Sequence, residues 1–439
     1  MKDISMNPAG ILQDALANRG EPVDIVHLTR TPPFATGSFT QIITKIMRDM
    51  TAYRQAAVSL WEGPPPDDEQ ARRNIVLVSR KQLSLWQRMS LNLPCAIRSR
   101  LFEGIGGRGD LTYIWQARKA LRILKPKVVI CYDTPWIGAA MRRVIDWPCR
   151  VVLNQQGLSY FMPNEPACRT YSLQSYDSIW TSTHACYRYD RDRMSYYEPV
   201  VRVLPNPIDA DRFKPVSAAE KQRLRAQWKL PQDRPIVLFL SVLRPKKGAH
   251  MLLQAWPQIL QQTPDALLWI VGGGEPGYQQ YLARMAQSLG VADSVRFEGR
   301  VAEKVATCYQ AADIYVFSTL FVEGWGLSLS EAMACGLPCV TSESRVTRDI
   351  YTEREVLFVP DPNLDGAFAD PITRLLQNPE LRRQMGATAH SFVTQRFSYE
   401  VMLPRWEQAF AREMELIGEP NAAKPSRAAG RPLETVEQQ

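Results

Sequence analysis

The sequence predicts an α/β protein built from two parallel-sheet domains of similar size. Its 439 residues exceed the length that a single hydrophobic core usually supports. Short apolar segments alternate with segments of helical periodicity along most of the chain, which is the pattern of parallel sheets covered by helices. The proline-rich segment 204–209 separates two such series, and the alternation restarts after it. Two doubly wound α/β domains that face each other across this linker are therefore expected.

The N-terminal domain is expected to span residues 1–213. Its loop around Gly37 precedes a helix that starts near Phe39, and the acidic, proline-rich segment 61–70 is typical of a surface loop. The predicted strands are Val23–Leu28, Asn74–Ser79, Lys127–Tyr132, Arg150–Asn154, Ser178–Thr181 and Val201–Leu204.

The C-terminal domain is expected to span residues 214–395. A final helical segment, 396–417, follows it, and the tail 418–439 has the composition of a disordered segment. The predicted strands are Pro235–Val242, Ala266–Val271, Ser294–Phe297, Asp313–Phe317, Pro338–Thr341 and Val356–Val359, with helices at Lys247–Leu260, Tyr278–Leu289 and Glu303–Ala312.

The composition is that of a globular protein of a reducing compartment. Hydrophobic residues make up 45% of the chain and charged residues 22%. No run approaches the roughly 20 apolar residues of a membrane-spanning helix. The eight cysteines and four histidines form no disulfide framework and no metal-ligand spacing. We therefore expect a cytoplasmic protein without a metal site or cofactor.

Positive charge is concentrated in the N-terminal half. Residues 1–213 hold 28 Lys and Arg against 20 Asp and Glu, which accounts for the whole net charge of +8. The segment 80–102 has five basic residues, no acidic residue, and a Trp among its apolar residues. Such a segment is typical of a helix lying on an anionic membrane surface, but a core-facing helix with a solvated basic face has the same periodicity.

A Gly-Trp-Gly turn between two glutamates is the most informative motif. Glu323 precedes the turn, Glu331 follows it, and the strand expected at Asp313–Phe317 lies just upstream. In open α/β sheets, ligands bind at the carboxyl ends of strands, where a helix start also favours an anion. The two carboxylates could therefore hold sugar and ribose hydroxyls. Ser328 and Glu331 also match a capping box, a purely structural alternative for Glu331.

Two further loops suggest phosphate binding. The segment Leu243–Gly248 places three cations where a strand turns into a helix, although a solvated basic loop would look the same. The segment Gly272–Gly277 matches G-x-G-x-x-G, and Glu298 ends the next predicted strand, as in a dinucleotide site. An NAD-dependent oxidoreductase is therefore a rival hypothesis, although Pro276 removes one N–H from the loop and no hydride-transfer site accompanies it.

With these residues assembled, the chain resembles family 4 of the retaining glycosyltransferases, also called group 1. The resemblance is most specific from Val203 to Tyr399 and strongest in the E-x7-E element that begins at Glu323. It implies the GT-B fold, in which two Rossmann-like domains enclose a nucleotide-sugar site. It also implies that the last helix returns to the N-terminal domain. The C-terminal domain would bind the donor and the N-terminal domain would bind the acceptor. No metal would be required.

The resemblance implies a role for several residues. Lys247 would hold the donor diphosphate and neutralise its charge as the nucleotide leaves, and Glu331 would accept hydrogen bonds from the ribose. Glu323 would bind hydroxyls of the transferred sugar. The backbone of Gly324, Trp325 and Gly326 would contact that sugar. The backbone near Val301 would contact the nucleobase.

The chain departs from the family pattern at two positions of the cleft. Val242 stands where the family has an Arg, and Arg244 follows two residues later as a substitute on the donor side. On the acceptor side, Gln156 stands where many members have a His. Gly37 corresponds to the family's glycine-rich first loop.

The function expected from the resemblance is hexose transfer from a nucleoside-diphosphate donor to an acceptor hydroxyl with retention of configuration. The acceptor is expected to be a glycan or a lipid-linked molecule of glycan, lipopolysaccharide, exopolysaccharide or glycolipid synthesis. The segment 80–102 would meet an anionic membrane, and nucleic acid is not an expected partner. A non-catalytic nucleotide-sugar-binding paralogue is the first alternative, and the oxidoreductase the second.

Overall fold

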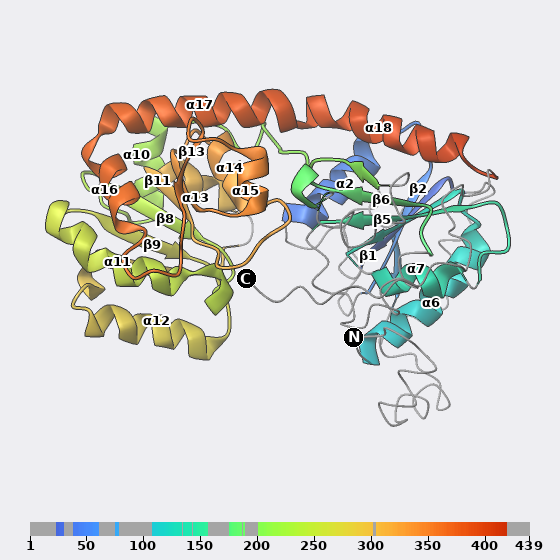
Figure 1. Ribbon diagram of the computed structural model, residues 1–439, viewed down its shortest axis with the longest axis horizontal. Coiled ribbons are helices and arrows are strands. Elements are labelled where there is room, and N and C mark those ends of the chain that lie inside the picture. The colour runs from blue at the N-terminus through green and yellow to red at the C-terminus, as the bar shows by residue number, and fades with distance from the viewer. Residues whose placement is uncertain are drawn as a thin grey trace, which may run out of the picture.

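The computed structural model contains two parallel β-sheets, each covered by helices, side by side along the long axis of the molecule (Figure 1). The structure describes residues 23–29, 38–60, 75–78, 108–156 except 134 and 143, 175–188 except 187, and 201–418 except 302 and 303. Gly37 and the segment 80–102 lie outside the described residues. The two-domain α/β architecture predicted from the sequence is confirmed.

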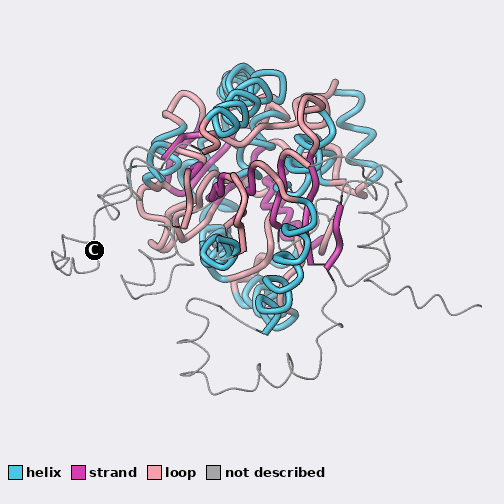
Figure 2. The backbone as a smooth tube through the Cα atoms, turned by 90° about the vertical axis from the view of Figure 1, so that its right-hand side faces the viewer, coloured by secondary structure: helices cyan, strands magenta, loops and turns pink. Residues whose placement is uncertain are grey.

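The first sheet has the strand order β3-β2-β1-β4-β5-β6-β7, with all neighbours parallel. Figure 2 views the molecule from the side on which this sheet lies, with helices around the strands. The strands are β1 Ile25–Thr29, β2 Gln55–Leu60, β3 Ile75–Val78, β4 Val128–Tyr132, β5 Arg150–Gln155, β6 Ser178–Thr181 and β7 Val201–Val203. The helices include α2 Ser38–Asp49, α6 Arg108–Leu124 and α7 Pro135–Arg142.

The second sheet has the order β10-β9-β8-β11-β12-β13 and is also parallel. Its strands are β8 Ile236–Leu240, β9 Leu267–Val271, β10 Val295–Gly299, β11 Ile314–Phe317, β12 Cys339–Ser342 and β13 Val356–Val359. The helices are α10 Ala218–Gln227, α11 Ala249–Gln262, α12 Pro276–Ser288, α13 Val305–Ala311, α14 Leu327–Ala334, α15 Arg345–Ile350, α16 Ala369–Gln377 and α17 Pro379–Phe397, with short 3₁₀ turns η3 Pro245–Lys247 and η4 Ala292–Ser294.

In this sheet the strand order reverses between β8 and β11, which are neighbours although two strands separate them in the sequence. The crevice at the carboxyl ends of two such strands is the usual ligand site of open α/β sheets. The loops that follow β8 and β11 contain Lys247 and Glu323. The topology therefore brings the two predicted catalytic residues to one crevice.

The chain crosses between the domains twice, and the two crossings are hydrogen-bonded to each other. The Ile208 N–H donates to the Phe397 carbonyl at 2.6 Å, and the Tyr399 N–H donates to the Ile208 carbonyl at 3.2 Å. The second crossing leads into α18, Tyr399–Glu415, which runs from the second domain across the first (Figure 1). The two crossings therefore run side by side as one connection between the domains.

Helix α18 packs against the first sheet through an apolar face. Met402, Trp406 and Phe410 are fully buried in a cluster with residues of β1, β4, β5 and β6. Trp406 meets Trp180 of β6 edge-on at 5.9 Å between ring centroids. Burying one large apolar side chain contributes about 2 kcal/mol, so these contacts hold the helix on the first domain.

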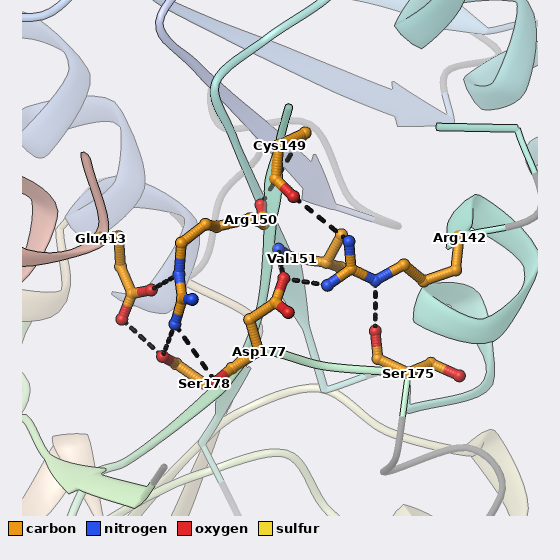
Figure 3. A network of polar contacts seen from close by, with 8 residues as sticks. All are labelled: Arg142, Cys149, Arg150, Val151, Ser175, Asp177, Ser178 and Glu413. Atoms are coloured by element: carbon orange, nitrogen blue, oxygen red, sulfur yellow. Dashed lines mark hydrogen bonds and ion pairs between the residues drawn. The ribbon is translucent and has the colours of Figure 1, made fainter. Parts of the chain in front are cut away.

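A buried ionic network also joins α18 to the first sheet (Figure 3). The Glu413 carboxylate accepts from Arg150 Nε at 2.7 Å and from the Ser178 hydroxyl at 2.6 Å, and its side chain has no exposed surface. Arg150 begins β5 and Ser178 begins β6. Because these are the amino ends of the strands, the network lies at the edge of the first sheet opposite the carboxyl ends of its strands. It therefore contributes to the docking of α18 rather than to a ligand site.

Candidate active site

A cavity of about 610 Å³ opens at the carboxyl ends of β8, β9 and β10. The linker contributes Arg212 and Phe213 to its walls, and α2 of the first domain contributes Gln41, whose side-chain carbonyl accepts a hydrogen bond from Arg212. Both domains therefore enclose the cavity. The other lining residues are Leu240, Ser241, Val242, Val271, Gly272, Gly273, Gly274, Arg300, Val301, Val305, Ser328 and Glu331.

Lys247 and Glu323 form an ion pair where the loops after β8 and β11 meet, at the same edge of the sheet, but neither residue lines this cavity. Lys247 is the last residue of η3, and Gly248 after it has φ +76°, so that a Cβ there would lie 1.8 Å from the Ser318 carbonyl oxygen. This close approach, possible only for glycine, fixes the loop after β8 against the end of β11. The Thr319 hydroxyl donates to Glu323 Oε1 at 3.1 Å, so that a cation and a hydroxyl both orient the carboxylate.

Glu331 lies on α14 and faces the cavity, although it is only 4% exposed. Helix α14 begins at Leu327 with Gly326 as its N-cap, so that Ser328 and Glu331 do not occupy the N-cap and N3 positions. The capping-box alternative is therefore wrong. The Tyr309 hydroxyl donates to Glu331 Oε2 at 3.1 Å. Burial and the adjacent carboxylate raise the pKa of Tyr309 well above its usual value, which keeps this phenol a donor.

We expect Glu331→Ala to weaken the binding of nucleoside diphosphates by roughly 10- to 100-fold, because a hydrogen bond to a charged group contributes about 1.5–3 kcal/mol. Calorimetric titration with a nucleoside diphosphate and with its 2′,3′-dideoxy analogue measures the effect. The dideoxy nucleotide should bind the variant and the wild type equally, because it lacks the hydroxyls that the carboxylate would accept from. An equal loss for both nucleotides would contradict the ribose role.

The Gly-Trp-Gly turn lies between the second sheet and the first domain. Trp325 is 4% exposed, and its ring meets Phe397 edge-on at 4.9 Å between centroids. The Gly324 carbonyl accepts a hydrogen bond from Ser182 of the first domain at 2.9 Å. Gly326 adopts φ +76° at the start of α14. The turn that joins the two glutamates is thus held by residues of both parts of the chain.

The remaining predicted residues occupy different places. Val301 lines the cavity, as does Val242, which is 50% exposed. Arg244 is exposed and precedes η3, outside the set of cavity-lining residues. Gln156 follows β5 and does not line this cavity; its side chain is hydrogen-bonded to Asn154 and to Asn206 of the linker.

The rival dinucleotide site does not fit the observed sheet. The glycines at 272–274 follow β9, which is one strand away from the point where the strand order reverses. Glu298 is engaged on β10, where it accepts from Trp269 Nε1 at 3.0 Å and pairs with Arg296 at 2.7 Å. A dinucleotide fingerprint requires its glycines at the first strand of the crevice and a carboxylate available to the ribose. The oxidoreductase hypothesis that rests on this motif is therefore not supported by the observed sheet.

Sequence reasoning missed several residues of this region. Tyr309, Gln41 and Arg212 contact or line the site, but they come from an interior helix, a helix of the other domain and the linker. The position of Arg212 beside Phe213 at the end of the linker is the one signal that could have indicated a cleft residue. Among the described residues, no group of three or more His, Cys, Asp or Glu could hold a metal ion, and no helix is long and apolar enough to span a membrane.

The chain is similar to known glycosyltransferases in sequence and in fold. Residues 220–392 match the family described as Glycosyl transferases group 1. The GDP-mannose-dependent alpha-(1-6)-phosphatidylinositol monomannoside mannosyltransferase of Mycolicibacterium smegmatis is 31% identical over 302 residues, which are 65% of this chain and 76% of that protein. The mannosylfructose-phosphate synthase of Agrobacterium fabrum is 34% identical over 170 residues, 37% of each chain.

Two solved structures show the same fold over nearly the whole chain. The sucrose-phosphate synthase of Thermosynechococcus elongatus superposes with a TM-score of 0.72 at 20% identity and covers 89% of this chain and 98% of its own. The Anabaena HepE protein in complex with UDP-glucose has a TM-score of 0.70 at 16% identity and covers 89% and 100%. The GT-B fold expected from the resemblance is confirmed, and the chain belongs to the group 1 glycosyltransferases.

Proposed function

We propose that this glycosyltransferase moves a hexose from a nucleoside-diphosphate donor to an acceptor hydroxyl with retention of configuration. The observation that carries the proposal is the Lys247–Glu323 pair, which lies in the loops after the neighbouring strands β8 and β11, at the edge of the sheet where Glu331 lines a cavity. In this assignment Glu331 would hold the ribose, Lys247 the diphosphate and Glu323 the transferred sugar. These are the three consecutive groups of a nucleotide sugar.

Lys247 and Glu323 would act at the bond that breaks. The Lys247 ammonium would stabilise the negative charge that grows on the departing diphosphate, the kind of contribution that is usually largest in group transfer. Glu323 would accept hydrogen bonds from hydroxyls of the sugar. These bonds would hold the anomeric carbon of the sugar facing the acceptor hydroxyl. The proposed attack occurs from the face that the diphosphate leaves, so that no covalent bond to the protein forms.

We propose GDP-mannose as the first donor to test, because the mannosyltransferase relatives are named as dependent on it. The HepE complex, by contrast, holds UDP-glucose. A thermal-shift panel of nucleoside diphosphates and nucleotide sugars separates the two. The correct donor at 100 times its dissociation constant should add about 2.7 kcal/mol of stability, and a panel without any stabilising nucleotide would contradict the donor assignment.

The proposed acceptor is a glycan or a lipid-linked glycan at the inner face of a membrane. The positive charge of residues 1–213 supports it, as do relatives named for phosphatidylinositol mannosides. We expect the protein to float with anionic but not with neutral liposomes at low salt, and the binding to weaken as salt is added. Replacing the five basic residues of 80–102 by Gln should abolish flotation. Absence of flotation together with full activity on a soluble acceptor would contradict the membrane role.

A further inference from the structure

The residues on both sides of Glu323 are contacted by the N-terminal domain. The segment 181–186, where β6 ends and the loop after it begins, reaches the glutamate turn. Ser182 donates its hydroxyl hydrogen to the Gly324 carbonyl at 2.9 Å, and the Cys186 thiol lies 3.8 Å from the same oxygen. Ser182 is 1% exposed and Cys186 is fully buried. The carbonyl that follows Glu323 is therefore held by two buried side chains of the other domain.

The residue before Glu323 is held by apolar packing. Val322 packs, together with Ile350, against a small buried cluster that joins the two domains. Its buried members are Ala185, Cys186 and Val346.

A second polar contact joins the same segment to the C-terminal domain, but away from the glutamate turn. Asp349 of α15 accepts from the Ala185 N–H at 2.8 Å and pairs with Arg188 at 2.6 Å. The side chain of Arg188 is 54% exposed. This pair contributes to the docking of the domains without touching Glu323 or its neighbours, so that it offers a matched comparison for Ser182.

The hydrogen bond from Ser182 also sets the direction of a backbone donor. In a planar trans peptide, the C=O of one residue and the N–H of the next point in opposite directions. Because the Gly324 carbonyl points to Ser182, the Trp325 N–H points away from the segment 181–186. On its other side, Glu323 is held by Lys247 and Thr319 of its own domain. Contacts from two domains thus determine the conformation of one turn.

We propose that Ser182 is a positioning residue for the glutamate turn, and that Glu323 and the Trp325 N–H reach their working orientation only when the two domains are docked. This inference rests on the proposed function. It makes domain docking a condition for sugar transfer rather than for nucleotide binding, because the nucleotide cavity is lined mainly by the C-terminal domain. The buried Gly324 carbonyl, without Ser182, would lose its hydroxyl partner and the turn could rotate.

We expect Ser182→Ala to lower kcat about tenfold or more, because a buried hydrogen bond is lost and a reacting group is displaced. The dissociation constant of the nucleoside diphosphate should stay at its wild-type value. Ser182→Thr keeps the hydroxyl and should restore most of kcat. Arg188→Gln breaks the exposed pair with Asp349 and should leave kcat within about threefold of the wild type.

The results of these experiments distinguish a failure of the proposed function from a failure of the positioning role of Ser182. A wild type that releases no nucleoside diphosphate from any donor contradicts the proposed function itself. With an active wild type, two results overturn the positioning role: full kcat in Ser182→Ala, whether or not its unfolding temperature falls, or equal losses of kcat in Ser182→Ala and Arg188→Gln. Failure of Ser182→Thr to recover activity, when the variant has the wild-type unfolding temperature, overturns it as well.

Discussion

Glu323→Gln is expected to lower the rate of sugar transfer by about 10²- to 10³-fold, the usual cost of removing one preorganised polar group that acts in the transition state. The substitution preserves size but removes the charge that pairs with Lys247 and accepts from Thr319. Affinity for the nucleoside diphosphate should be equal to that of the wild type or higher, because Lys247 loses its carboxylate partner. Steady-state rates and calorimetric titration measure the two quantities separately.

Glu298→Gln is the matched control for this substitution. Glu298 is also a partly buried carboxylate of the second domain that pairs with a basic residue, but it lies on β10 and is engaged by Arg296 and Trp269. We expect this variant to transfer sugar normally. A wild-type rate in Glu323→Gln, or equal losses in both variants, would contradict the assignment of Glu323 to the reacting sugar.

Glu413→Ala is expected to have the largest effect on stability, a loss of about 3–5 kcal/mol in the free energy of unfolding of the first domain. The substitution leaves the guanidinium of Arg150, 7% exposed, without its carboxylate and removes the acceptor of Ser178 (Figure 3). Denaturant unfolding followed by tryptophan fluorescence suits the measurement, because Trp180 and Trp406 pack together beside this network.

Two comparisons make the prediction about Glu413 specific. Glu415→Ala removes an exposed carboxylate of the same helix, paired with Arg412 three residues earlier, and should change stability little. The double variant Arg150→Met, Glu413→Leu removes both charges and should recover much of the loss, because an apolar pair can replace a buried ion pair. A loss in Glu415→Ala as large as that in Glu413→Ala would contradict the docking role of the buried network.

The sequence predicted the fold well, because parallel strands that are buried on both faces are apolar and easily recognised. Most of the observed strands overlap the predicted ones. Strand β2 was missed: its sequence, Gln55–Leu60, contains two alanines and a serine, and its hydrophobic pattern is weak. Glu413 was missed as a buried group, although it follows Met402, Trp406 and Phe410 at helical spacing on the apolar face of α18.

The site was predicted in part. The glutamate motif and Lys247 could be found because each lies where a strand ends. Their contact could not be deduced, because 76 residues separate Lys247 from Glu323 and only the strand order brings them together. The roles of Tyr309 and Ser182 depend on the packing of helices and domains, for which a local sequence pattern contains no signal.

The release of nucleoside diphosphate from GDP-mannose and other nucleotide sugars, with and without a lipid-linked acceptor, tests the central claim most directly. We predict slow release in water, faster release when the acceptor is present, and a loss of both in Glu323→Gln. Saturable binding of a nucleotide sugar without release from any donor would contradict the claim, because it would make the protein a nucleotide-sugar-binding member of the family rather than a catalyst.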